Sequence, residues 1–140
     1  MKKAGLLLVL LLILTGCGSS KVPQIEDYTW VMTSVQSVGA GGQAVAYGER
    51  GSSTLETAKQ IVLLCRAEEG SLTLIDQTNH KTYTGTYQLS KDSPQGAIYE
   101  VTIEGQEGYA AAAMTTYQDG SQDPTLIFNL GDYAVNFFAE

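Results

Sequence analysis

Short links between apolar segments are the feature of this sequence that most constrains its fold. From Tyr28 onward, segments rich in β-branched and aromatic residues are interrupted roughly every eight to twelve residues by Gly, Asn, Asp or Pro, which is typical of all-β domains. The pattern predicts strands at Tyr28–Val38, Gln43–Tyr47, Gln60–Ala67, Ser71–Gln77, Lys81–Ser90, Ala97–Ile103, Gly108–Tyr117, Thr125–Leu130 and Tyr133–Phe138.

Several links between these segments are too short for anything except an antiparallel hairpin. They are Glu68-Glu69-Gly70, Thr78-Asn79-His80, Glu104-Gly105-Gln106 and Gly131-Asp132. Consecutive strands are therefore expected to pair, and closure of the sheet would remove its exposed edges. The predicted fold class is all-β, an antiparallel up-and-down meander of eight to nine strands that closes into a barrel.

Alternation within the strands assigns one face of each to the core, because successive side chains point to opposite sides of a sheet. The residues expected in the core are Tyr83, Gly85, Tyr87, Leu89, Tyr99, Val101, Ile103, Leu126, Phe128, Leu130, Tyr133, Val135 and Phe137. The segment Gly39–Lys59 breaks the rhythm. There we expect a loop or a single helical turn, opened by a capping box at Ser53–Glu56 and covering one open end of the barrel.

The N-terminus has the parts of a bacterial export signal: two lysines, an apolar run over residues 4–14, and small residues before Cys17. At about 1.5 Å of helical rise per residue, this run spans about half of a ~30 Å hydrocarbon core, so we expect cleavage. Leu14-Thr15-Gly16-Cys17 resembles the lipobox of bacterial lipoproteins. The resemblance implies cleavage between Gly16 and Cys17 and attachment of a diacylglyceryl group to the Cys17 thiol. An ordinary secretory signal that happens to carry a cysteine is the alternative.

This interpretation divides the chain into a lipoprotein signal peptide (1–16), a flexible tether (17–26) and a barrel domain (27–140). Acyl chains on Cys17 would hold the domain at the extracytoplasmic face of the cell membrane. Removal of the signal leaves six of the eight basic residues against fifteen acidic ones, a formal charge of −9 that disfavours nucleic acid as a partner. Lipidation also leaves Cys65 without a disulfide partner, so stability is expected to come from packing.

Three short motifs resemble those of small bacterial lipocalin-like lipoproteins. They are Asp27-Tyr28-Thr29-Trp30 on the first strand, Gly85-Thr86-Tyr87 in mid-chain, and Asn136-Phe137-Phe138 at the C-terminus. Tyr28 stands where lipocalins usually carry Gly. The resemblance implies a lipocalin-like barrel with Trp30 closing its base and an internal cavity for small hydrophobic molecules.

No constellation in the sequence predicts catalysis, a metal site or a cofactor. His80, the only histidine, lies in a turn and has no recognisable partner. Cys65 follows an apolar run and is expected to be a core thiol. Glu68 and Glu69 occupy a hairpin tip, where surface charge is expected. The segment 119–123 offers oxygen ligands but lacks EF-hand spacing, which favours a plain turn.

The eight tyrosines are the one unusual enrichment. Tyr83, Tyr87 and Tyr99 share the expected inner face, where they would line a ligand cavity. The alternative is that they simply fill strands, as tyrosine commonly does. We therefore expect a non-catalytic, membrane-anchored lipoprotein that binds a small ligand or an envelope component. The alternative is a protein-interaction or inhibitor module that acts through its outer face and loops.

Overall fold

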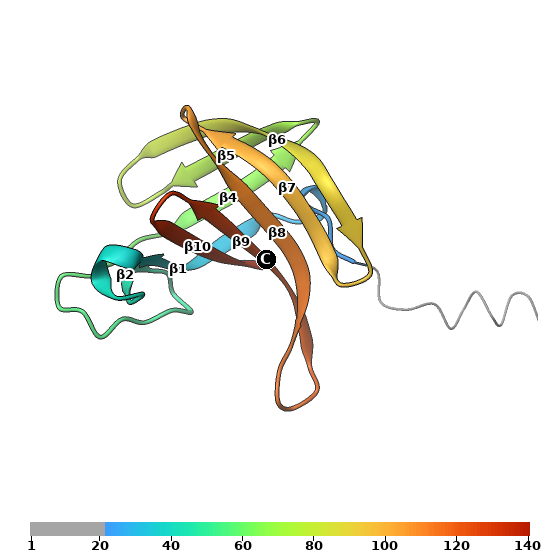
Figure 1. Ribbon diagram of the computed structural model, residues 1–140. Helices are drawn as coiled ribbons and strands as arrows, with labels where there is room; N and C mark the ends of the chain where they lie inside the picture. Colours follow the sequence, from blue (N-terminus) through green and yellow to red (C-terminus); the bar gives the residue numbers. More distant parts are fainter. Residues whose placement is uncertain (1–21) are drawn as a thin grey trace, which may run out of the picture.

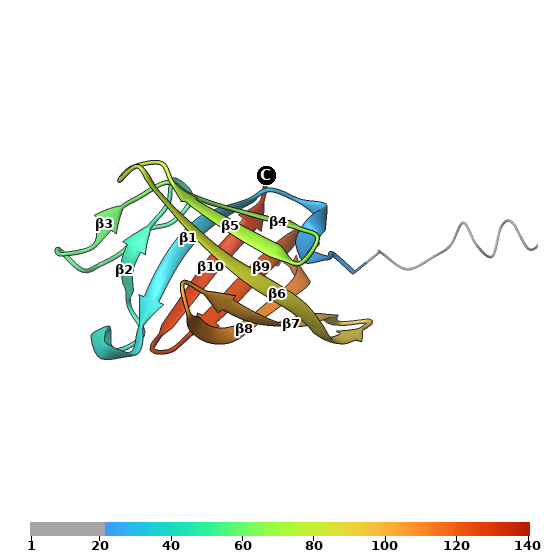
Figure 2. The ribbon, with the colours of Figure 1, turned by 90° about the horizontal axis from the view of Figure 1, so that it is seen from above.

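A computed structural model describes residues 22–140 of the chain. Eight strands pair in chain order as an antiparallel meander, and the last pairs with the first to close a barrel (Figure 1, Figure 2). They are β1 (Trp30–Ser37), β4 (Leu63–Glu68), β5 (Ser71–Asp76), β6 (Lys81–Ser93), β7 (Gly96–Ile103), β8 (Gln106–Thr116), β9 (Gln122–Leu130) and β10 (Tyr133–Ala139). The predicted fold class is confirmed, and the closed eight-stranded ring is compatible with a lipocalin-like barrel.

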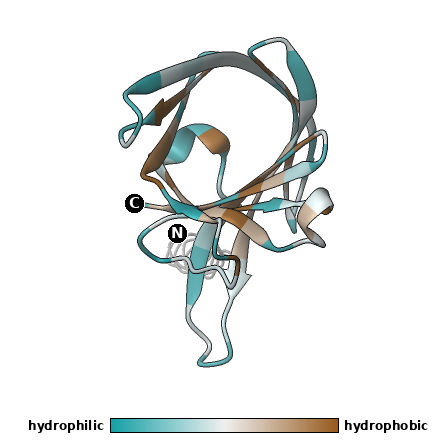
Figure 3. Cartoon of the chain, turned by 90° about the vertical axis from the view of Figure 1, so that its left-hand side faces the viewer, coloured by the Kyte–Doolittle hydropathy of each residue, from teal (hydrophilic) through white to brown (hydrophobic). Residues whose placement is uncertain are grey.

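Two further strands lie outside the ring. β2 (Ala44–Tyr47) pairs with the second half of β1, and β3 (Lys59–Gln60) adds a short parallel pairing to β2. We call residues 44–60 the flap. It lies beside the ring and not across its opening (Figure 3), so the expectation that Gly39–Lys59 covers an open end is wrong. The reason is that β1 pairs with β4 only at Trp30 and Val31, which leaves the rest of that edge to β2.

One end of the barrel is closed by the 3-10 helix η1 (Ile25–Asp27), which Figure 3 shows as a turn inside the ring. Ile25 is fully buried, and its carbonyl oxygen accepts a hydrogen bond of 2.8 Å from Nε1 of Trp30. Pro23 is buried as well. Packed structure therefore begins a few residues before the domain boundary expected at residue 27. A second 3-10 helix, η2 (Val38–Ala40), follows β1.

Most of the predicted core face is confirmed. Tyr99, Val101 and Phe128 have at most 3% of their surface exposed. Leu89 and Tyr133 are exceptions, with 47% and 49% exposed, so their assignment to the core is wrong. Leu89 lies beyond the start of β5, beside a bulge in the pairing of β6 with β7, and Tyr133 begins β10 directly after a turn. Neither residue has the neighbours on all sides that burial requires.

The signal peptide and lipobox, including Gly16 and Cys17, lie outside the described residues. Within residues 22–140, no helix has the length and apolar character needed to cross a bilayer.

Candidate functional site

From its middle to the end closed by η1, the interior of the barrel is filled by its own side chains. Trp30, Leu126 and Phe128 have no exposed surface, so no void large enough for water touches them. Large and small residues alternate across the strands, as where Ala110 lies between Tyr99 and Phe128. An eight-stranded barrel is just wide enough for such filling.

The three tyrosines expected to bind a ligand do not gather around one space. Tyr87 and Tyr99 are in edge-to-face contact, with ring centroids 5.8 Å apart. The hydroxyl of Tyr99 accepts a hydrogen bond from the backbone N–H of Ile25 (3.1 Å) and donates one to Oε1 of Gln24 (3.0 Å). Burial raises the pKa of both tyrosines. Their position and partners indicate that they hold η1 in place.

Tyr83 lies four residues before Tyr87 on the same strand, about 13 Å away at the usual rise. It is half-buried, packs against the core, and pairs with Leu74 of β5. This places it toward the end of the barrel opposite η1. The aromatic ring of Tyr83 is therefore separated from the pair formed by Tyr87 and Tyr99.

The polar candidates of the turns have ordinary structural positions. His80 and Glu69 are exposed in hairpin turns, and Glu68 is exposed at the end of β4. Asp119 accepts hydrogen bonds from the backbone N–H and the hydroxyl of Ser121, which lowers its pKa and forms a plain turn. Among the described residues, no group of three or more His, Cys, Asp or Glu is arranged to hold a metal ion.

Cys65 is fully buried in β4, as expected for a core thiol. Burial raises the pKa of its thiol to about 12. The thiolate is the reactive form of cysteine, so this residue is unsuited to nucleophilic chemistry near neutral pH.

A buried carboxylate, Asp76, was missed by sequence reasoning. It has 6% of its surface exposed and accepts hydrogen bonds from the backbone N–H and the side-chain amide of Asn79 (2.9 and 2.8 Å). Burial opposes its charge, but these bonds, together with Thr78 and Lys81, lower the pKa overall. The spacing Asp76-x-x-Asn79 at the start of a turn was the available signal. Asp76 therefore has a structural role in the link from β5 to β6.

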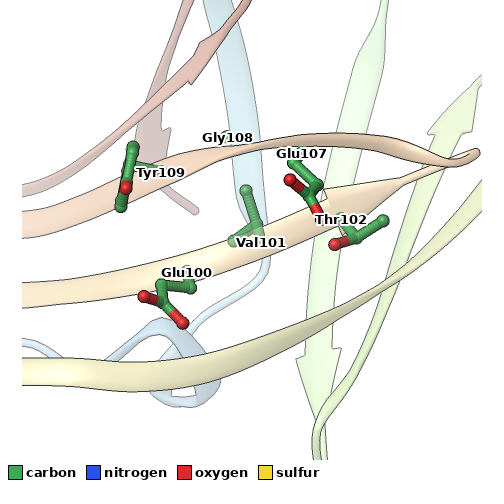
Figure 4. A pocket seen from close by; sticks show the side chains of 6 residues that line it. All are labelled: Glu100, Val101, Thr102, Glu107, Gly108 and Tyr109. Carbon is green, nitrogen blue, oxygen red and sulfur yellow. The ribbon is translucent and has the colours of Figure 1, made fainter.

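Two clefts lie on the outside of the barrel. The first, of about 550 Å³, runs over the outer face of β7 and β8 (Figure 4). Glu100 lies opposite Tyr109 across the two strands, and Thr102 lies opposite Glu107. We call these four residues the outer groove. Its floor includes Gly108, where a Cβ atom would collide with the carbonyl oxygen of Asn129 on β9.

A second cleft, of about 370 Å³, separates the flap from the barrel. Its walls include Val31, Leu64 and Phe138, and the guanidinium of Arg50 lies 4.1 Å from the centroid of the Phe138 ring. Gly48 brings the flap against β1, since its N–H donates to the carbonyl oxygen of Thr33 (2.8 Å). A Cβ at Gly48 would collide with the Met32 carbonyl. We call this space the flap cleft.

A scan against known protein families, a search of curated proteins and a search of solved structures each found no match to this chain.

Proposed function

We propose that this chain is a non-catalytic lipoprotein that is anchored through Cys17 at the extracytoplasmic face of a bacterial membrane and binds an envelope or extracellular macromolecule through the outer face of its barrel. The observation that carries the binding part is the filled interior. Trp30 and Phe128 lie inside the barrel with no exposed surface, which argues against a small ligand held beside them. Binding therefore falls to the outer surface, which carries half-exposed apolar side chains such as Ile98 and Ile127.

The anchor rests on the lipobox Leu14-Thr15-Gly16-Cys17. The full chain, expressed in a bacterium, should partition into the detergent phase, and its mature N-terminus should have the mass of a lipidated Cys17. Cys17→Ser should move to the aqueous phase. Cys65→Ala is the matched control and should partition like the wild type, because this thiol is buried in the barrel. An unmodified N-terminus in the wild-type protein would refute lipidation.

The filled interior has its own test, because xenon enters apolar cavities that water leaves empty. Methyl resonances of the full chain in neutral micelles are recorded under increasing xenon pressure. We expect no saturable shift at Leu72 or Leu126, which have at most 1% exposed surface. Saturable shifts at these methyl groups would show an internal cavity that can hold a ligand. This result would count against binding through the outer face.

A small ligand remains a second candidate, supported by the flap cleft. Its volume of about 370 Å³ is within the usual range of small-molecule sites. Its lining combines the apolar walls with Glu49, Arg50 and Glu140, which would suit a small amphipathic molecule. Ligand binding that is lost in Arg50→Ala but retained in Lys59→Ala, an exposed flap residue outside the cleft, would support this candidate. Equal binding by both variants would exclude it.

A further inference from the structure

The four strands β7 to β10 carry charge of a single sign. Residues 96–140 contain seven acidic residues and no Lys, Arg or His. The acidic residues are Glu100, Glu104, Glu107, Asp119, Asp123, Asp132 and Glu140, and all are exposed. The basic residues of the described chain precede this segment, at Arg50, Lys59, Arg66, Lys81 and Lys91. One half of the barrel wall therefore presents a negative potential to solvent.

Apolar side chains lie on the outer surface of the same strands. Strand pairing places Ile98, Ala111 and Ile127 in one row across β7, β8 and β9. Ile98 and Ile127 are 40% and 38% exposed. Lys91 of β6 lies opposite Ile98 and marks the border with the other half of the barrel. Neighbouring exposed apolar residues with a polar rim are typical of interaction surfaces.

Tyr109 is the most exposed ring of this surface, at 57%. It lies in the row next to Ala111, directly opposite Glu100 on β7 and opposite Asn129 on β9. Figure 4 shows its side chain along the same outer groove as the carboxylates of Glu100 and Glu107. An aromatic face beside carboxylates is a suitable environment for an ammonium or guanidinium group. We call Ile98, Glu100, Glu107, Tyr109 and Ile127 the acidic face.

The charge of this face decides between classes of partner. Nucleic acid and anionic lipid surfaces would be repelled by it. A purely apolar partner would remove water from Glu100 and Glu107 without compensating their charge, which is unfavourable. A second copy offering the same face would bring like charges together. A basic polypeptide that also carries apolar side chains satisfies both the carboxylates and the isoleucines.

We infer that the acidic face is a docking surface for a basic protein segment, with a lysine or arginine in the outer groove and apolar side chains against Ile98 and Ile127. This inference rests on the proposed function, because it names the partner of the outer face. The exposed ion pairs would each contribute modestly, so we expect the apolar contacts to supply the rest of the affinity.

The test uses the full chain in neutral detergent micelles and three labelled peptides that differ only in charge: a lysine–leucine peptide, its glutamine–leucine counterpart and its glutamate–leucine counterpart. Fluorescence anisotropy should rank the affinities in that order. Raising the salt concentration from about 50 mM to about 0.3 M should weaken binding of the lysine peptide, because the Debye length shortens. Equal affinity for the three peptides would overturn the inference.

Matched variants separate a specific site from general charge attraction. E100Q/E107Q should reduce affinity for the lysine peptide by about three- to tenfold, and Tyr109→Ala by a similar factor. E68Q/E69Q changes the net charge equally, at an exposed turn on the other half of the barrel, and should alter affinity less than about twofold. Equal losses in the two glutamine pairs would overturn the inference by showing attraction to net charge alone.

Two further outcomes would also overturn the inference, the first by moving the site and the second by changing the occupant. Loss of peptide binding in Arg50→Ala but not in E100Q/E107Q would move the site to the flap cleft. Self-association of the wild type that E100Q/E107Q abolishes, measured by sedimentation, would make the occupant a second copy. Either result would leave binding through the outer surface intact. Failure of the proposed function itself would instead appear in the xenon measurement, as an interior that accepts a ligand.

Discussion

The hydroxyl oxygen of Tyr99 lies 3.1 Å from the backbone nitrogen of Ile25, which is 74 positions earlier in the chain. This hydrogen bond joins the strand β7 to the helix η1 that closes one end of the barrel. Both residues are buried, with 1% and 0% of their surfaces exposed. Tyr99, which was expected to line a ligand cavity, thus holds in place the helix η1 that closes the barrel.

Tyr99→Phe should destabilise the protein by about 1–3 kcal/mol. The change leaves the buried N–H of Ile25 without its partner, and an unsatisfied buried donor carries a cost of that size. Urea unfolding of the full chain measures the loss. Tyr109→Phe is the control, since its ring is 57% exposed and the change should stay within about 0.5 kcal/mol. Equal stability of the two variants would contradict the role given to Tyr99.

Trp30→Ala should cost about 3–5 kcal/mol, because a fully buried indole is replaced by a cavity. It also removes the N–H that donates to the carbonyl of Ile25. Tyr28→Ala is the comparison: Tyr28 contacts Trp30 edge to face with centroids 5.3 Å apart, but it is 37% exposed. Its loss should be much smaller. If denaturation shows Tyr28→Ala to be the more damaging change, Trp30 does not anchor the closed end.

Gly108→Ala should destabilise the barrel by about 1–3 kcal/mol, the usual cost of overpacking. Its Cβ would meet the carbonyl oxygen of Asn129 and, at 2.7 Å, Cδ2 of Leu130. Gly39→Ala should be nearly neutral, because the nearest atom to its Cβ would be Oγ of Ser37 at 3.6 Å. Melting temperatures of the two variants give the comparison. A similar decrease in both would argue against close approach of β8 to β9.

The free energy of unfolding should decrease at alkaline pH because the Cys65 thiol ionises more easily in the unfolded chain. This thiol has a pKa of about 12 in the folded state against an ordinary 9.0, so unfolding releases a proton between these values. Stability should therefore fall as pH rises above about 9, by up to about 1.4 kcal/mol per pH unit for this group. Tyr87 and Tyr99 act in the same direction at higher pH.

The variant Cys65→Ala isolates this contribution. Urea unfolding at neutral pH and at successive values above pH 9 should show a shallower decline for the variant than for the wild type. The tyrosine contribution remains in both proteins. Parallel declines would mean that the Cys65 thiol ionises equally easily in the folded and unfolded states.

Most of the fold could be predicted from the alternation of side chains along the strands and from the short links between them. Alternation along β7 correctly placed Tyr99, Val101 and Ile103 inside, because a strand with one wet face shows its period in the sequence. The position of the flap was not predictable, since β1 divides its edge between β4 and β2 by tertiary pairing. Closure by η1 was also missed, because Gln24 and Ile25 find their partner on a strand distant in sequence.

The candidate site was less well predicted, for a different reason. The tyrosines were assigned to a cavity by their shared face, but the sequence does not show how wide the barrel is or whether Phe128 and Trp30 fill it. The acidic face did have a signal, the absence of Lys, Arg and His from residues 96–140. A count over the whole chain hides this asymmetry.

Photo-cross-linking in living cells tests the central claim, binding through the outer face, most directly. Benzoylphenylalanine replaces Tyr109 in the outer groove or, as the comparison, the half-buried Tyr83 that packs against the core. After irradiation of the full-length protein, we predict a discrete adduct with a macromolecule at position 109 and none at position 83. An adduct at position 83 with none at position 109 would contradict the account.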